Sequence, residues 1–172
     1  PGTYNYHVPK RIRNQFRATK NHNTVCVDNR NQSEILGPFL WGEKYKINHV
    51  EFSDSSDDKC TICAELQNNI YTHERKFNYN RKNLLTIEDT VHGGKDIFFC
   101  LMCDSKLNIK LDENMVQIFI NNKQISIEFD GAAEIKEERA ECSEKYCAKK
   151  TAKILYVKFK TNKLKTKIII EG

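Results

Sequence analysis

Polar side chains able to bind an anion or a metal are concentrated between residues 17 and 28. They are an arginine, a histidine, an asparagine and two threonines, in the order Arg17, Thr19, His22, Asn23 and Thr24. A guanidinium group binds a carboxylate through two parallel hydrogen bonds, and an imidazole is a common metal ligand. The stretch predicts either a site for an acidic sugar or a metal, or a loop whose side chains hydrogen-bond to the nearby backbone.

No catalytic set is complete within the 172 residues of the sequence. No serine stands in a nucleophile elbow, no glycine-rich phosphate loop occurs, and no pair of carboxylates is framed by apolar sequence. Most acidic residues fall in turns or alternate with lysines. We therefore assign no catalytic residue to this chain.

The seven cysteines include two C-x-x-C pairs, Cys60 with Cys63 and Cys100 with Cys103. This spacing is typical of a zinc ribbon, and a zinc-ribbon nucleic-acid binder would need both pairs to chelate. However, the second pair lies in the unbroken apolar run 97–103, and residues three apart on a strand point to opposite faces. We therefore expect the cysteines to act mainly as small hydrophobic residues, without a dense disulfide framework.

The net charge of +5, from 28 basic and 23 acidic residues, would suit an acidic polysaccharide or a nucleic acid as partner. On alternating strands, most of the lysines are expected simply to form a solvated face. No apolar run reaches the length of a membrane span, and no signal peptide is present. Because the chain starts at Pro1 rather than at a methionine, we expect it to be a fragment of a longer protein.

The rest of the chain reads as short strands separated by turn residues, which predicts one domain over residues 1–172. About twelve strand-like runs are expected, at 24–28, 35–41, 45–52, 60–66, 70–79, 84–91, 96–103, 106–111, 115–120, 123–129, 151–160 and 163–171. The fold class is therefore all-β, a mostly antiparallel β-sandwich with little helix. Residues 1–21, with Pro9 blocking regular pairing, are expected to form an extended arm. Residues 134–150 are rich in helix formers, which leaves two or three helical turns open there.

Several motifs together resemble a known family. Residues 16–28 read Phe-Arg-x-Thr-x-x-His-Asn-Thr-Val-x-Val-Asp, and Gln32-Ser33-Glu34 and Gly37-Pro38-Phe39 follow. Gly2-Thr3-Tyr4-x-Tyr6 and Arg13-Asn14-x-Phe16 precede this block, and His73-x-Arg75 and Ile87-x-Asp89-x-Val91 come later. The pattern, dense over residues 1–55 and thinner to Val91, resembles the C-terminal β-sandwich domain of the heparinase II/III-like polysaccharide lyases. Asn29 departs from it, because the family usually has glycine there.

The resemblance implies a supersandwich-like fold in a parent enzyme that cleaves uronic-acid polysaccharides by β-elimination. The acid/base groups of such an enzyme would come from an N-terminal helical toroid and a preceding strand, both absent here. It also implies that residues 134–150 form a strand followed by a long loop containing Ser143 and Tyr146, and we adopt that prediction over a helix.

Three site residues follow from the resemblance. His22 would bind zinc or another divalent metal, with co-ligands from the missing upstream segment, or would be a structural histidine bonded to the neighbouring backbone. Arg17 would bind a substrate carboxylate, or would pair with Asp28 or Glu34. Asn23 would contact substrate or brace the turn, whereas His73 and Arg75 are expected to be structural.

Two functions remain open. The first is the sheet domain of a polysaccharide lyase, inactive alone, with an acidic polysaccharide and the missing toroid as partners and with neither nucleic acid nor a membrane span. The alternative is a non-catalytic carbohydrate-binding or structural domain in cell-envelope polysaccharide assembly. The location would be the periplasm or cell envelope if the parent carries a signal peptide. The residues upstream of Pro1 would distinguish the two functions.

Overall fold

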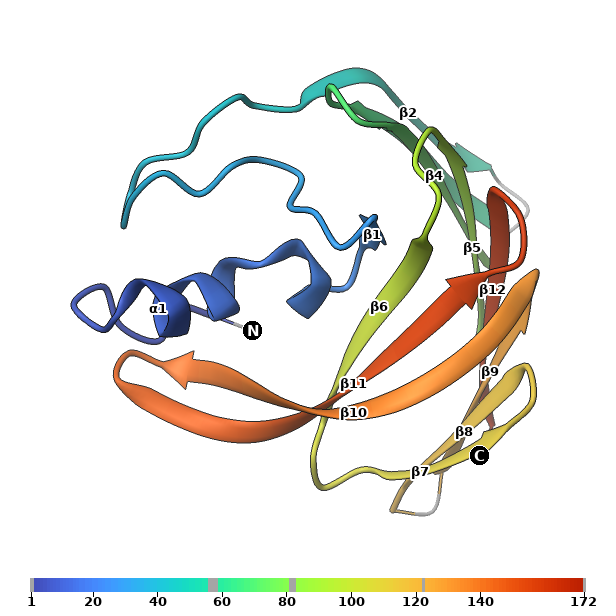
Figure 1. The fold of residues 1–172 in the computed structure, drawn as a ribbon. Helices are drawn as coiled ribbons and strands as arrows, with labels where there is room; N and C mark the ends of the chain where they lie inside the picture. Colours follow the sequence, from blue (N-terminus) through green and yellow to red (C-terminus); the bar gives the residue numbers. More distant parts are fainter. Residues whose placement is uncertain (1, 56–58, 81–82, 122, 172) are drawn as a thin grey trace.

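The computed structural model describes residues 2–55, 59–80, 83–121 and 123–171. Within these residues, the helix α1 (Lys10–Arg17) and the 3-10 helix η1 (Thr19–Asn21) precede twelve strands. Every strand pair is antiparallel, and the strands form two sheets that face each other (Figure 1). The expected all-β antiparallel sandwich with little helix is therefore confirmed.

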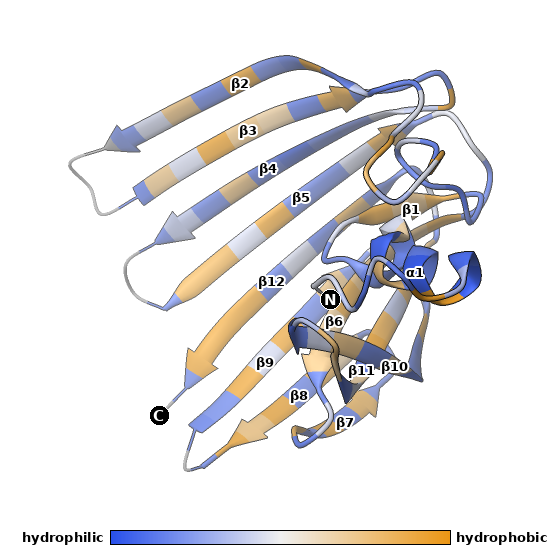
Figure 2. Ribbon diagram, turned by 90° about the vertical axis from the view of Figure 1, so that its left-hand side faces the viewer, coloured by the Kyte–Doolittle hydropathy of each residue, from blue (hydrophilic) through white to orange (hydrophobic). Residues whose placement is uncertain are grey.

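The two sheets differ in size. The large sheet has the order β2 (Lys46–Ser55), β3 (Lys59–Gln67), β4 (Thr72–Asn80), β5 (Leu84–His92), β12 (Lys163–Glu171), β9 (Lys123–Asp130), β8 (Met115–Ile120) and β7 (Asn108–Asp112). The small sheet has the order β1 (Val25–Val27), β6 (Ile97–Asp104), β11 (Ala148–Phe159) and β10 (Ala132–Lys145). Hydrophilic and hydrophobic residues alternate along several strands of the large sheet, such as β9, which is why one face of that sheet is apolar (Figure 2).

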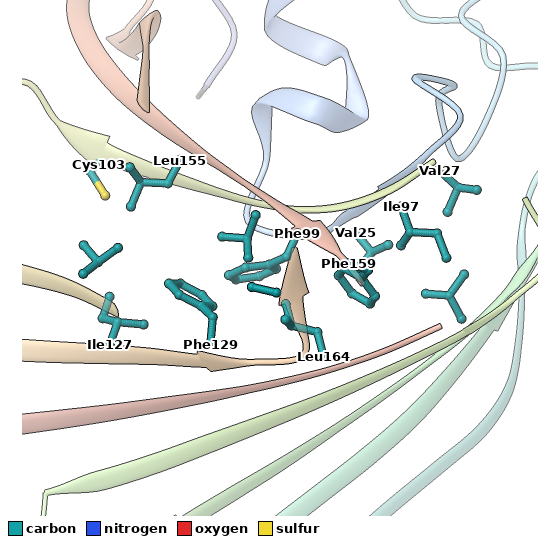
Figure 3. Close-up of a cluster of buried hydrophobic side chains, with 14 of the residues drawn as sticks. Val25, Val27, Ile97, Phe99, Cys103, Ile127, Phe129, Leu155, Phe159 and Leu164 are labelled. Atoms are coloured by element: carbon teal, nitrogen blue, oxygen red, sulfur yellow. The ribbon is translucent and has the colours of Figure 1, made fainter. Parts of the chain in front are cut away.

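The hydrophobic core lies between the two sheets. Figure 3 shows side chains from both layers meeting there, namely Val25, Val27, Ile97, Phe99, Cys103, Ile127, Phe129, Leu155, Phe159 and Leu164. The rings of Phe99 in the small sheet and Phe129 in the large sheet lie 6.2 Å apart between centroids. Both side chains are almost fully buried, so this contact joins the layers at the centre of the sandwich.

A second cluster covers the opposite face of the small sheet. It contains Cys26 of β1, Cys100 of β6 and Ile154 of β11, all nearly inaccessible to solvent. The helical elements α1 and η1 lie on this outer side, away from the large sheet (Figure 1). The small sheet is therefore buried on both faces at β1, β6 and the middle of β11, whereas β10 stays largely exposed, and the sheet presents β1 to the N-terminal segment.

The N-terminal segment is not the extended arm that the sequence suggested. Residues 10–17 form α1, and the carbonyl of Pro9 accepts hydrogen bonds from the backbone N–H groups of Ile12 and Arg13. Proline is disfavoured inside a sheet, but its fixed φ suits the start of a helix. Phe16, one turn after Ile12, is buried against the rest of the chain.

Two further predictions fail. Residues 35–41 form a loop with only an isolated bridge between Ile35 and Trp41, because Gly37-Pro38 interrupts the strand pattern. In residues 134–150 the expected strand is present, and the alternative of a helix is not realised. The long loop expected after the strand is absent. β10 runs to Lys145 and includes Ser143, and a tight turn at Tyr146 and Cys147 leads directly into β11. Extensive pairing between β10 and β11 overrides the helix propensity of this segment.

The cysteines are all free, and the two C-x-x-C pairs lie in different sheets. Cys100 belongs to the outer cluster of the small sheet and Cys103 to the core, so the two point to opposite faces of β6. The described residues include no helix long and apolar enough to cross a membrane.

Candidate functional site

A cavity of about 940 Å³ lies between the N-terminal segment and the loop that leads to β2. Its lining comprises Gly2, Thr3, Tyr6, Phe16, Arg17, Thr19, His22, Thr24, Gln32, Ser33, Pro38, Phe39, Trp41, Lys44 and Tyr45. Among the described residues the lining includes no aspartate or glutamate, but it includes an arginine, a lysine and a histidine. This composition favours an anionic ligand over a cationic one.

Arg17, at the end of α1, is held on one wall of this cavity. Its Nη1 donates a hydrogen bond to the carbonyl of Gly37, and its guanidinium lies 4.0 Å from the centroid of the Trp41 ring. Burial, followed by the nearby charge of Arg13, lowers the pKa of Arg17 below its usual value. An arginine remains charged at neutral pH despite such a shift. Arg17 pairs with neither Asp28 nor Glu34, so that alternative is not what the described residues show.

His22 lines the same cavity, immediately after η1. Its backbone N–H donates to the carbonyl of Thr19, and its own carbonyl accepts from Thr24, which fixes the path of the chain into β1. The side chain is exposed at the cavity edge, yet the wall removes water from part of the ring. This desolvation lowers the pKa of His22, and a hydrogen bond to the backbone of Phe16 opposes it only in part. The imidazole is therefore neutral at neutral pH, the form that can bind a metal or accept a proton.

Asn23 has a bracing role in the structure. Its side-chain oxygen accepts a hydrogen bond of 2.8 Å from the backbone N–H of Met102 in β6. Its backbone carbonyl accepts one of 3.2 Å from Nη1 of Arg75 in β4. Asn23 does not line the cavity, although Arg17 and His22 on either side of it do. The structure thus brings two of the three predicted site residues together.

The Arg75 contact belongs to a buried ionic network. The carboxylate of Asp89 is fully buried and accepts hydrogen bonds from Nε and Nη2 of Arg75 at 2.6 and 3.1 Å. His73 Nε2 lies 2.7 Å from the same carboxylate. Burial alone would raise the pKa of Asp89, but His73 and Arg75 outweigh it and hold that pKa below its usual value. The structural role expected for His73 and Arg75 matches these contacts.

Side chains from the loop 32–45 complete the cavity, and sequence reasoning did not single them out. Tyr6 stacks on Phe39 with centroids 4.4 Å apart, and Trp41 lies against Arg17. Phe39 is 75% exposed and Tyr45 is 45% exposed, unusual values for aromatic side chains in a sandwich. The sequence pattern predicted strands at 35–41 and 45–52, and no binding role was assigned to the aromatic residues there. Their clustering around Gly37-Pro38 is the signal that could have revealed them.

The described residues do not complete a metal site. No group of three histidine, cysteine, aspartate or glutamate side chains comes together among them. In the cavity itself His22 is the single residue of these types, so the chain offers one ligand where a divalent metal needs three or four. Any metal bound at His22 would require ligands from another segment. The cavity can bind an anion by charge, hydrogen bonds and aromatic contact.

Comparison with known proteins places this geometry in context. Residues 1–171 match the family described as heparinase II/III-like, C-terminal. A heparan sulfate lyase, HepC from Pedobacter heparinus, shares the fold with a TM-score of 0.78 at 16% identity, covering 99% of this chain and 28% of that chain. A heparinase III, the BT4657 gene product, gives 0.75 at 19% identity, covering 99% and 27%.

Another structure titled heparinase III gives a TM-score of 0.70 at 17% identity, covering 95% of this chain and 25% of that chain. At such identities the similarity shows the fold alone. The chain spans only 25–28% of the length of these three solved chains. No curated protein sequence matches it.

Proposed function

Because the chain belongs to the heparinase II/III-like C-terminal domain family, we propose that it is the sheet domain of a polysaccharide lyase. Its substrate would be an acidic, uronic-acid-containing polysaccharide, cleaved by β-elimination in the complete enzyme. The fold-sharing proteins include a heparan sulfate lyase and two heparinases III by title, which supports this class of substrate.

The observation that carries the proposal is the composition of the cavity wall. Arg17 and Lys44 supply positive charge, His22 supplies a neutral imidazole, and no described residue of the lining carries a carboxylate. Exposed aromatic faces at Phe39, Trp41 and Tyr45 offer apolar contact of the kind that the C–H face of a sugar ring uses. A uronate-containing polysaccharide presents both carboxylates and the C–H faces of sugar rings, which match the cationic and the aromatic side chains of this wall.

The chain supplies binding rather than a complete reaction centre. β-Elimination requires a base within hydrogen-bond reach of the proton α to the carboxylate, and a group that neutralises the developing enolate charge. Arg17 can neutralise charge, but its guanidinium cannot act as a base at neutral pH. His22 is neutral and can accept a proton, yet the described residues of the lining include no carboxylate that could act with it as an acid/base pair. A metal held by His22 with ligands from elsewhere is part of the proposal for the complete enzyme only.

The experiment uses Trp41, the single tryptophan of the chain, as a reporter inside the cavity. Heparan sulfate should change its emission saturably and more weakly as salt rises, and neutral dextran should not change it. Calorimetric titration should show that Arg17→Ala lowers the affinity about tenfold, because charge-assisted hydrogen bonds are lost. The matched control is Arg139→Ala, which removes an exposed arginine on β10 outside the cavity and should leave affinity within about twofold.

Equal losses from the two arginine variants, or no saturable binding, would contradict the proposal. Binding without elimination activity in the longer protein would instead favour a non-catalytic carbohydrate-binding domain. One observation supports that alternative. The described residues of the cavity provide an aromatic and cationic wall, but they do not provide an acid/base pair.

A further inference from the structure

The edge strand β2 is the least protected edge of the two sheets. The small sheet ends at β1, which has three buried residues, and at β10, whose exposed positions are mostly charged. The large sheet ends at the short strand β7 and at β2. β2 has ten residues without proline or glycine, its residues 46–54 are all exposed, and no described strand pairs with its free edge. A long, unblocked edge of this kind readily pairs with another strand.

The apolar face of the core continues to this edge. Register places Phe52, Ile62, Phe77, Ile87, Thr166 and Phe129 in one row across the large sheet. Exposure along that row rises from 0% at Phe129 and 7% at Ile87 to 40% at Ile62 and 66% at Phe52. The same face of β2 also carries Val50, 65% exposed, and Ile47, 51% exposed. Three large apolar side chains therefore reach solvent together on the free edge.

The sequence of β2 is complementary to itself in an antiparallel pairing centred on Val50. That register sets Val50 opposite Val50 of a second copy and His49 opposite Glu51, twice by symmetry. A bulge lies between Ile47 and His49, where Asn48 is held on the other face by hydrogen bonds to Glu65 and Gln67. With Asn48 as the extra residue, Ile47 falls opposite Phe52 of the second copy.

We propose that two copies of this chain associate through β2, forming one continuous sheet across a twofold axis at Val50. Apolar rows then cross the interface without a break. Each row runs from Leu66 to Ile47 in one copy and continues through Phe52 to Ile62 in the other. On the opposite face, His49 of each copy meets the carboxylate of Glu51 of the other. His49 and Glu51 already lie 3.2 Å apart within one chain, so both side chains are on the face that this exchange requires. The inference is independent of the polysaccharide proposal.

The test is the mass of the 172-residue chain in solution, measured by sedimentation equilibrium from about 1 µM to about 1 mM, the range of weak to moderate affinities. We expect a reversible monomer–dimer equilibrium. Val50→Lys, which brings two ammonium groups together at the axis, should abolish the dimer over this range. His49→Glu should weaken it about tenfold by setting two carboxylates against each other on each side of the axis.

A charge exchange makes the test specific for this register. Adding Glu51→Lys to His49→Glu replaces the two carboxylates on each side of the axis by a carboxylate and an ammonium group, and should return the dissociation constant to within about threefold of the original. Lys110→Glu, on the edge strand β7 at the other end of the sheet, is the control and should leave the dimer intact. A chain that is monomeric at the highest concentration would overturn the proposal. A dimer that survives Val50→Lys, or that the exchange fails to restore, would do the same.

Discussion

Removing Arg75 should destabilise the fold far more than removing an exposed cation from the same sheet. Arg75→Met leaves the carboxylate of Asp89, which is fully buried, with His73 as its remaining partner. Breaking a buried ion pair from one side costs about 3–5 kcal/mol, because the other charge stays desolvated. For a domain of this size, that corresponds to a fall of about 6–20 °C in melting temperature.

Lys165→Met is the matched control. It breaks the pair between Lys165 and Glu88, whose nitrogen and oxygen lie 3.3 Å apart and whose side chains are about half exposed. Such a surface pair contributes at most about 1 kcal/mol. Urea denaturation at pH 7, followed by circular dichroism, gives both free energies of unfolding from the midpoints and slopes.

The effect of Arg75→Met should also depend on pH. The pKa of Asp89 is held below its usual value in the folded chain, so its ionic contribution is present above the unfolded pKa of about 3.9 and is lost as pH falls through the folded pKa. The difference between wild type and variant should therefore shrink in acid. A destabilisation below about 1 kcal/mol at pH 7, or one of equal size at pH 3 and pH 7, would refute the reasoning.

Three other outcomes are expected. Phe129→Ala should lower the free energy of unfolding by about 3–5 kcal/mol, because it opens a cavity against Phe99, whereas Phe119→Ala on the exposed face should cost below about 1 kcal/mol. Chelator should leave the melting temperature unchanged and release no stoichiometric zinc, since the cavity offers His22 alone; one zinc per chain lost together with the fold would contradict this. The isolated chain should produce no rise in ultraviolet absorbance from unsaturated uronate with heparin, heparan sulfate or alginate, because an absent base costs about two to four orders of magnitude in rate; a measurable rise would show that the cavity is catalytically complete.

Most of the strands could be predicted, because alternation of apolar and polar residues along a strand indicates which face of its sheet is buried. The expected runs 115–120 and 123–129 form the paired strands β8 and β9, and within β8 the alternate residues Val116 and Ile118 lie in the core. The same logic failed at Pro9, which is compatible both with a broken strand and with the start of a helix. In residues 134–150 the strand that the family resemblance implied is present, but the long loop is not, because pairing with β11 continues almost to the turn.

The candidate site was only partly predictable. Arg17 and His22 are close in sequence, so a short helix and turn bring them to one wall. The opposite wall comes from residues around Phe39 and Trp41, and nothing in a local pattern indicates that this loop folds back against the N-terminal segment. Asn23 was grouped with its neighbours, but it precedes β1 and its side-chain oxygen accepts a hydrogen bond from the backbone N–H of Met102 instead of lining the cavity.

The burial of β6 on both faces has a consequence for local opening and amide hydrogen exchange. β6 lies between the core and the cluster around Cys100, and it is paired on both sides, by β1 and β11. Its amide hydrogens can exchange only when both apolar layers separate, which amounts to global unfolding. β2 lies at the other extreme, with one neighbour and exposed side chains from residue 46 to residue 54. Exchange in the monomer should therefore begin at β2 and reach β6 last, so that the most exposed strand and the most protected strand belong to different sheets.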